Sequence, residues 1–408
     1  MSFQIRPITP EEFEPFARAN AAGFSNDLWL AHMDGPPSYF ECDRSLGVLD
    51  GEEFVGTTSI FSFDTTVPGG GALPTAGVTW VSVKPTHRRQ GILGQMMRRQ
   101  LVHVRERGEP IASLWASESI IYGRFGYGLA ADTLDLEVER LRASFAHEPP
   151  SSGRVRMIDR DGALASWPAV YDAVRAQHPG LHSRSEAWWK DKTLPEKDIP
   201  GGGGFTGRFF VQYEEDDRPL GYARYRVRHA GENGLANGTL AVQELMAATD
   251  GAYAALWRYL FGVDLIGTVQ ARLRRSDEPL RYMLADPRRL IRRPADSLWV
   301  RIIDPVVALE GRRYASEGRL VLDVRDAFCP WVEGRYELEG GPAGATCRTT
   351  TAEPDVSLSA ADLGAAYLGG TRFGTLQRAG RVEGDSKAVH RADAMFAWDP
   401  LPWCPEVF

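Results

Sequence analysis

The sequence is poor in cysteine and contains no long apolar run. The four cysteines in 408 residues, Cys42, Cys329, Cys347 and Cys404, lie far apart and form no C-x-x-C pair. This spacing argues against a disulfide framework and against a metal site such as zinc, and it fits a reducing compartment. No stretch approaches the roughly 18 unbroken apolar residues of a membrane span. The start, MSFQIRPITPEEF, lacks a basic segment followed by an apolar one, so we expect a cytoplasmic protein.

An excess of basic residues is also missing. The chain has 47 Lys and Arg against 54 Asp and Glu, which gives a formal net charge of −7 at pH 7. A nucleic-acid-binding protein needs a basic surface, so this balance argues against a nucleic-acid partner. A mildly acidic chain is compatible with a cationic partner, although many cytosolic proteins share this property.

Two polar, proline-containing stretches divide the chain into three blocks. They are AHEPPSSGR at 146–154 and LADPRRLIRRPADS at 284–297. We therefore predict domains over 1–148, 149–292 and 293–408, each of ordinary domain size. The first block alternates strand and helix patterns, the second repeats that order without a basic turn, and the third is typical of an α+β unit. The predicted fold class is α/β (α+β).

One segment of the first block predicts an anion site. WVSVKPTHRRQGILGQMM (80–97) combines an apolar strand, a turn, two arginines, a glycine and a helical pattern. The start of a helix offers unpaired backbone N–H groups and partial positive charge, which favour a phosphate. Arg88 and Arg89 add fixed charge, and Gly91 lets a ligand approach the backbone. The segment has neither the P-loop nor the G-x-G-x-x-G spacing. A solvated helix start that happens to carry arginines is the alternative.

The segment resembles the pyrophosphate loop of GCN5-related N-acetyltransferases (GNAT), which is Arg/Gln-x-x-Gly-x-Gly/Ala after a splayed strand. Arg88 and Gly91 match this motif, and Leu93 departs from it, because a small residue is usual there. ASESIIYGRFGYG (116–128) is similar to the later GNAT segment that carries a tyrosine. With the repeated block and the third block, the whole chain resembles the Eis (enhanced intracellular survival) subgroup of aminoglycoside N-acetyltransferases. The resemblance implies tandem GNAT domains, the first catalytic and the second degenerate, followed by a sterol carrier protein-like domain.

The resemblance also implies acetyl-CoA as the co-substrate. Its pantetheine arm would lie along the strand end, and its pyrophosphate would lie at the helix start. The residues implied in coenzyme binding are Val81, Ser82, Val83, Arg88, Arg89, Gln90, Gly91, Ile92, Leu93, Gly94, Ser117 and Glu118. A splayed strand leaves N–H groups free to pair with the amide-rich pantetheine or to stabilise negative charge on the acyl oxygen.

Acetyl transfer to an amine needs a proton donor for the departing thiolate and a proton acceptor for the amine. Tyr122 fits the donor role by its place in the motif; the alternative is an ordinary core tyrosine. The chain ends in FAWDPLPWCPEVF, an apolar tail that is typical of a docked terminus rather than a mobile one. In the Eis subgroup the terminal carboxylate is the general base, which implies this role for Phe408. A free α-carboxyl has a pKa of about 3.3–3.7, so it must be buried beside the amine or act through water.

The acceptor pocket is the least specified part of the prediction. The residues that we expect around it are Asp27, Trp29, Thr79, Trp80 and Glu406. Trp80 fits a core position equally well. The resemblance implies a small cationic amine as the acceptor and a homohexamer as the assembly. Two alternatives stay open: a protein or peptide lysine N-acetyltransferase, and a non-catalytic acyl-CoA- or lipid-binding protein that uses the third block.

Overall fold

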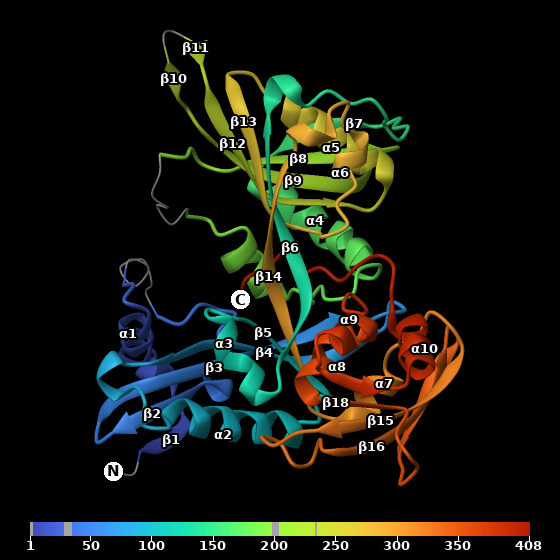
Figure 1. Ribbon diagram of the computed structural model, residues 1–408. Helices are drawn as coiled ribbons and strands as arrows, with labels where there is room; N and C mark the ends of the chain where they lie inside the picture. The colour runs from blue at the N-terminus through green and yellow to red at the C-terminus, as the bar shows by residue number, and fades with distance from the viewer. Residues whose placement is uncertain (1–2, 28–34, 198–203, 233–234) are drawn as a thin grey trace. The chain divides into compact units, whose positions relative to one another are not determined.

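The computed structural model describes residues 3–27, 35–197, 204–232 and 235–408. Trp29, one of the residues predicted around the acceptor, lies outside these ranges. The chain forms two compact units, which are described separately. The first unit comprises Met1–Ala131, Ser297–Pro402 and Val407–Phe408. The second unit comprises Asp132–Asp296 and Trp403–Glu406. The first unit therefore contains both ends of the coloured ribbon in Figure 1, blue and red.

The amino-terminal part of the first unit is a mixed sheet. Four strands run antiparallel in chain order, and a fifth joins the last of them in parallel. These strands are β1 (Gln4–Pro7), β2 (Leu46–Asp50), β3 (Glu53–Thr66), β4 (Ala72–Val83) and β5 (Ile111–Trp115). The end of β14 (Ile291–Ile302) pairs antiparallel with β5. A single parallel pair thus lies beside an antiparallel meander, and the candidate site forms at that pair.

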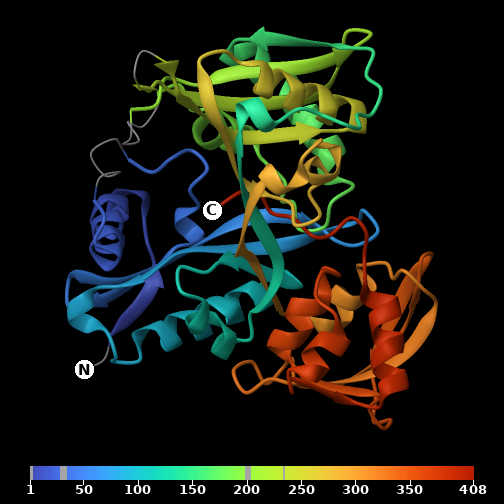
Figure 2. The ribbon, with the colours of Figure 1, turned by 45° about the horizontal axis from the view of Figure 1, so that its top comes forward.

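Two helices cover the two faces of this sheet (Figures 1 and 2). Helix α1 (Phe13–Phe24) packs on β3 and β4, and α2 (Ile92–Glu106) packs on the other face. The helical spacing predicted after Gly91 is confirmed. The apolar residues of α2 that point into the core are Ile92, Met96, Met97, Leu101 and Val104. Because they recur every three or four residues, they form one buried stripe against the sheet.

The carboxy-terminal part of the first unit is an α+β domain, as the sequence predicts. Its five-stranded sheet has the order β17-β16-β15-β18-β19. The strands are β15 (Gly318–Arg325), β16 (Gly334–Gly341), β17 (Gly344–Thr349), β18 (Val356–Ser359) and β19 (Val382–Gly384). The helices, gathered on one side of this sheet in Figure 2, are α7 (Pro305–Glu310), α8 (Ala360–Tyr367), α9 (Phe373–Arg378) and α10 (Ser386–Phe396). Ser359 caps α8, because its hydroxyl accepts from the Asp362 N–H.

The second unit repeats the strand order of the first sheet. Its strands follow the order β6-β13-β12-β9-β8-β7, antiparallel except for the parallel pair β12–β13. They are β6 (Gly128–Glu139), β7 (Arg154–Ile158), β8 (Phe209–Glu215), β9 (Arg218–Arg228), β12 (Gly238–Ala247) and β13 (Ile266–Arg274). Its two long helices are α4 (Arg160–Arg175) and α5 (Asp250–Gly262). Thr249 caps α5 by accepting from the Ala252 N–H at 3.1 Å, and no arginine precedes this helix start. The counterpart of the basic turn therefore lacks the two arginines that precede α2.

The remaining short elements fall in the loops. They are α3 (Ser119–Tyr122), α6 (Leu280–Met283), β10 (Gly231–Glu232) and β11 (Leu235–Ala236). Of these, α3 matters most for the candidate site, because it carries the predicted catalytic tyrosine. No helix in the described part of the chain is long and apolar enough to cross a membrane.

Candidate active site

The candidate site begins where β4 parts from β5. The parallel pairing of these strands ends at Gly77 and Ser113, whereas β4 continues to Val83. Beyond Gly77, the backbone groups on that edge of β4 are directed towards the gap between the strands instead of towards a sheet partner. This is the splayed strand that the sequence motif predicts.

A β-bulge in β4 shapes the same region. The register with β3 shifts between Thr57 and Ser59, so that Trp80 and Val81 together oppose one residue of β3. Trp80 has a left-handed backbone with a φ of 53°, which costs a non-glycine residue about 1–3 kcal/mol. Its carbonyl accepts hydrogen bonds from Thr57 Oγ1 at 2.7 Å and Asn20 Nδ2 at 2.9 Å. These two bonds hold the bulge in place and set the direction of the strand end.

The start of α2 closes the site. Arg89 and Gly91 both have left-handed φ values, 64° and 80°, so the chain turns sharply into the helix. The first backbone bond of the helix runs from the Gln95 N–H to the Gly91 carbonyl at 3.1 Å. The N–H groups of the first turn are therefore free for a ligand. A β-carbon built on Gly94 would meet no atom within 4 Å, so the approach to these groups is open.

A cavity of about 920 Å³ joins these elements. Every residue predicted to bind the coenzyme lines it except Gln90, and Tyr122 lines it as well. Gln90 is exposed at the turn. The structure adds residues that the sequence did not indicate, at the end of α1 and after the tyrosine. These are Gly23, Phe24, Ser25, Ile121, Arg124 and Phe125, together with His87.

The two adjacent arginines of the motif have different surroundings. Arg88 donates hydrogen bonds to the carbonyls of Gly23 at 2.7 Å and Val83 at 3.3 Å, so it ties the end of α1 to the end of β4. Arg89 is exposed and makes no hydrogen bond or ion pair with any residue that the structure describes. Arg88 therefore positions the cavity wall, and the charge of Arg89 is available for a ligand.

Tyr122, at the end of α3, is 4% exposed. Burial raises its pKa to about 12, and a hydrogen bond with Ser117 opposes that shift only partly. The phenol therefore keeps its proton at neutral pH. The ring of Tyr127 packs edge-on against Tyr122 with centroids 6.1 Å apart. The protonated hydroxyl of Tyr122 is thus available at the cavity, and the contact with Tyr127 fixes the position of its ring.

Comparison with known proteins identifies this arrangement. An acetyltransferase (GNAT) domain model matches residues 4–130, a second acetyltransferase (GNAT) domain model matches 180–302, and a sterol carrier protein domain model matches 306–405. An uncharacterized N-acetyltransferase of Streptomyces avermitilis is 44% identical over 375 residues, 90% of each chain. The N-acetyltransferase Eis of Mycobacterium tuberculosis is 36% identical over 363 residues, 86% of this chain and 85% of the relative. The crystal structure of Eis1 from Mycobacterium abscessus superposes with a TM-score of 0.85 at 31% identity and covers 99% of this chain and 100% of that one.

The chain belongs to the Eis family of N-acetyltransferases. It has two GNAT domains followed by a sterol carrier protein-like domain, as the resemblance implied. Acetyl-CoA is the general co-substrate of GNAT domains, and this cavity fits it. The free N–H groups at the start of α2 and the unpaired Arg89 suit a diphosphate, and the splayed edge of β4 suits the amides of pantetheine. No cluster of three or more His, Cys, Asp or Glu among the described residues is arranged to hold a metal ion.

The predicted acceptor residues are dispersed. Trp80 is half-buried in an aromatic cluster on the α1 face, with ring centroids 5.0 Å from Phe40 and 5.8 Å from Phe13. Thr79 is buried, Asp27 is exposed, and neither they nor Trp80 line the cavity described above. Trp80 therefore packs in the fold around the bulge. The acceptor roles of Trp80, Thr79 and Asp27 stay predictions.

The carboxy-terminal tail of the chain is packed, as its apolar composition predicts. In the second unit, Trp403 and Cys404 are buried, and the Glu406 carboxylate accepts from Arg184 Nε at 2.8 Å and from the Trp188 indole. This carboxylate is neutralised by the protein itself, which does not favour a direct role in binding an amine. In the first unit, the Phe408 ring packs edge-on against Phe63 on β3, with centroids 5.2 Å apart.

Proposed function

We propose that this enzyme transfers an acetyl group from acetyl-CoA to a primary amine of an aminoglycoside or a related cationic polyamine. One observation carries the proposal. A single cavity gathers the free N–H groups of α2, the splayed edge of β4 and the protonated hydroxyl of Tyr122. Acyl transfer from a thioester needs all three: a place for the phosphates, a place for the pantetheine and a proton donor near the sulfur.

The coenzyme would be held by backbone more than by side chains. Val81–Val83 would pair with the pantetheine amides, and the first turn of α2 with Arg89 would bind the diphosphate. Acetyl-CoA supplies the activated acyl group when it is bound. An N–H of the bulged strand stabilises negative charge on the acyl oxygen, because the dipole is already oriented before the substrate arrives.

Two groups of this chain would handle protons. Tyr122 Oη holds a proton that it can donate to the departing sulfur, since its pKa of about 12 keeps the phenol neutral. The α-carboxylate of Phe408 would accept the proton of the attacking amine, directly or through water. A carboxylate in this role also attracts a cationic acceptor.

The test is acetyl-dependent thiol release by the purified full-length enzyme with a panel of amines: kanamycin, spermidine, a lysine peptide and no acceptor. We expect turnover with kanamycin or spermidine, and mass spectrometry should show a gain of one acetyl group on an amine. Turnover with the peptide alone would favour the lysine acetyltransferase alternative. Coenzyme binding without turnover of any amine would support the binding-protein alternative. The homohexamer stays a prediction, which light scattering coupled to size exclusion tests.

A further inference from the structure

Some of the basic side chains around the coenzyme cavity are paired with acceptors of the described part of the protein, and others are not. Among the described residues that line it, four can be cationic: His87, Arg88, Arg89 and Arg124. His87 faces Asp50 at 3.5 Å, and its other ring nitrogen pairs with a neighbouring hydroxyl. Arg88 is engaged with two backbone carbonyls. Arg89 and Arg124 are left with charge that no described residue neutralises.

Packing of the neighbouring Phe125 fixes the backbone position of Arg124. Arg124 follows Tyr122 in the short turn Gly123–Phe125, and its guanidinium lies 5.1 Å from the ring centre of Phe125. Phe125 is buried and packs edge-on against Phe328 with centroids 4.9 Å apart. The backbone of Arg124 is therefore held by the core, while its side chain is exposed.

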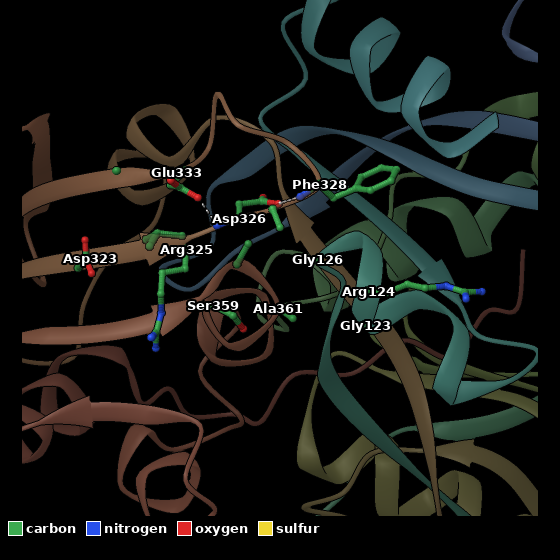
Figure 3. Close-up of a pocket in the computed structure, with 14 residues that line it drawn as sticks. Gly123, Arg124, Gly126, Asp323, Arg325, Asp326, Phe328, Glu333, Ser359 and Ala361 are labelled. Atoms are coloured by element: carbon green, nitrogen blue, oxygen red, sulfur yellow. Dashed lines mark hydrogen bonds between the residues drawn. The ribbon is translucent and has the colours of Figure 1, made fainter. Parts of the chain in front are cut away.

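A second cavity, of about 810 Å³, lies on the other side of this turn and is rich in carboxylates, among them Asp323, Asp326 and Glu333. Figure 3 shows that the Arg124 side chain extends away from these three acids. Each of the three acids already has a partner. Asp326 pairs with Arg301, Asp323 lies 3.7 Å from Arg335 Nε, and the Glu333 carboxylate accepts from the backbone N–H of Asp326 at 3.3 Å. Arg124 is therefore not a salt-bridge partner of the cavity that it borders in Figure 3.

Coenzyme A carries two separate phosphate groups, a diphosphate and a 3′-phosphate on the ribose. The start of α2 and Arg89 account for the diphosphate in the proposed function, on which this inference rests. The 3′-phosphate is a monoester that carries nearly two negative charges at neutral pH, and arginine is the side chain best matched to its oxygens. We propose that Arg124 binds the ribose 3′-phosphate and makes the enzyme select coenzyme A over 3′-dephospho-coenzyme A.

The test compares the affinities of coenzyme A and 3′-dephospho-coenzyme A by titration calorimetry on the full-length protein. The wild type should bind coenzyme A about tenfold tighter than the dephospho form, the usual effect of one charged hydrogen-bonded pair. Arg124→Gln should weaken coenzyme A binding about tenfold and leave dephospho-coenzyme A within about twofold, so that discrimination disappears. The matched control is Arg99→Gln, which removes the same charge from α2 at a position that does not line the cavity.

Arg89→Gln gives the second reference. It should weaken both ligands by the same factor, because both contain the diphosphate. Equal losses for both ligands in Arg124→Gln would place Arg124 at the diphosphate and overturn the assignment, as would discrimination that survives the substitution. Failure of the proposed coenzyme site looks different, because the wild type would then bind neither ligand, and failure of acetyl transfer alone would leave both affinities in place and abolish turnover of every amine.

Discussion

Tyr122→Phe removes a single oxygen from the candidate site. The ring is 4% exposed and packs edge-on against Tyr127, and phenylalanine preserves that packing. The contacts proposed for the diphosphate and the pantetheine lie on α2 and β4 and do not involve the hydroxyl. We therefore expect the variant to fold and to bind acetyl-CoA normally, while kcat falls.

The size of the loss follows from the pKa of the phenol. A positioned general acid contributes about 10²–10⁴-fold to rate. Burial raises the pKa of Tyr122 to about 12, whereas the departing thiol has a pKa of about 8.5 by analogy with cysteine. Complete proton transfer from phenol to thiolate is therefore uphill, and the hydroxyl acts mainly by hydrogen bonding to the sulfur as it leaves. This places the expected loss at the lower end, about 10²-fold in kcat or ~2.7 kcal/mol.

The pH dependence of the rate gives a second test of the raised pKa of Tyr122. An acid works in its protonated form, so Tyr122 loses its function only as pH rises through about 12. The wild-type rate should therefore show no falling limb due to Tyr122 below about pH 11. A falling limb near pH 9 that disappears in Tyr122→Phe would refute the argument from burial.

The chain provides a matched control in Tyr127→Phe. The Tyr127 hydroxyl is fully buried and makes no hydrogen bond with any residue that the structure describes. A buried unsatisfied polar group costs about 1–3 kcal/mol, so this variant should keep its kcat and unfold at a higher denaturant concentration. Steady-state kinetics with saturating acetyl-CoA measures both variants. A kcat of Tyr122→Phe within about threefold of the wild-type value would exclude Tyr122 as the proton donor. Equal losses of kcat in both variants would assign the effect to ring packing.

Three further results are expected. Arg89→Ala should raise the Kd for acetyl-CoA about tenfold in calorimetry and change kcat at saturation little, because its charge meets the diphosphate and not the reacting atoms. Asp326→Asn should destabilise the fold by about 3–5 kcal/mol in chemical denaturation, because it leaves the fully buried Arg301 without its carboxylate; a loss below about 1 kcal/mol would contradict this. Several residues added after Phe408 should abolish acetyl transfer and spare coenzyme binding, and a fully active extended enzyme would exclude the terminal carboxylate as the base.

The parts of the site that could be predicted from sequence are those fixed by local chemistry. Gly91 and the apolar spacing after it specify where α2 begins, and a helix start offers free N–H groups wherever it occurs. The segment around Tyr122 is also continuous in sequence. The wall at Gly23 could not be predicted, because it depends on the hydrogen bond from Arg88 across 65 positions of chain. Nothing near Gly23 in the sequence signals that contact.

Charge assignments were the least predictable feature. Arg88, Arg89 and Arg124 are the same residue type near the same cavity, and only their partners separate a positioning role from a binding role. Glu406 illustrates the same limit, because sequence places an acid near the chain end, whereas the structure neutralises it with Arg184. Long-range pairing decides which charges remain for a ligand, and residue type alone does not encode it.

The sterol carrier protein-like domain packs against the turn that follows Tyr122, the proposed general acid. Gly126 has a φ of 80°, and a β-carbon there would overlap the Arg301 guanidinium, which Asp326 holds from the carboxy-terminal domain. A β-carbon on Gly128 would likewise overlap the backbone of Ala361. The turn that positions Tyr122 is thus in close contact with the third domain at these two glycines. Because these contacts leave no space for adjustment, we expect the position of Tyr122, the proposed proton donor, to depend on the third domain as well as on the first.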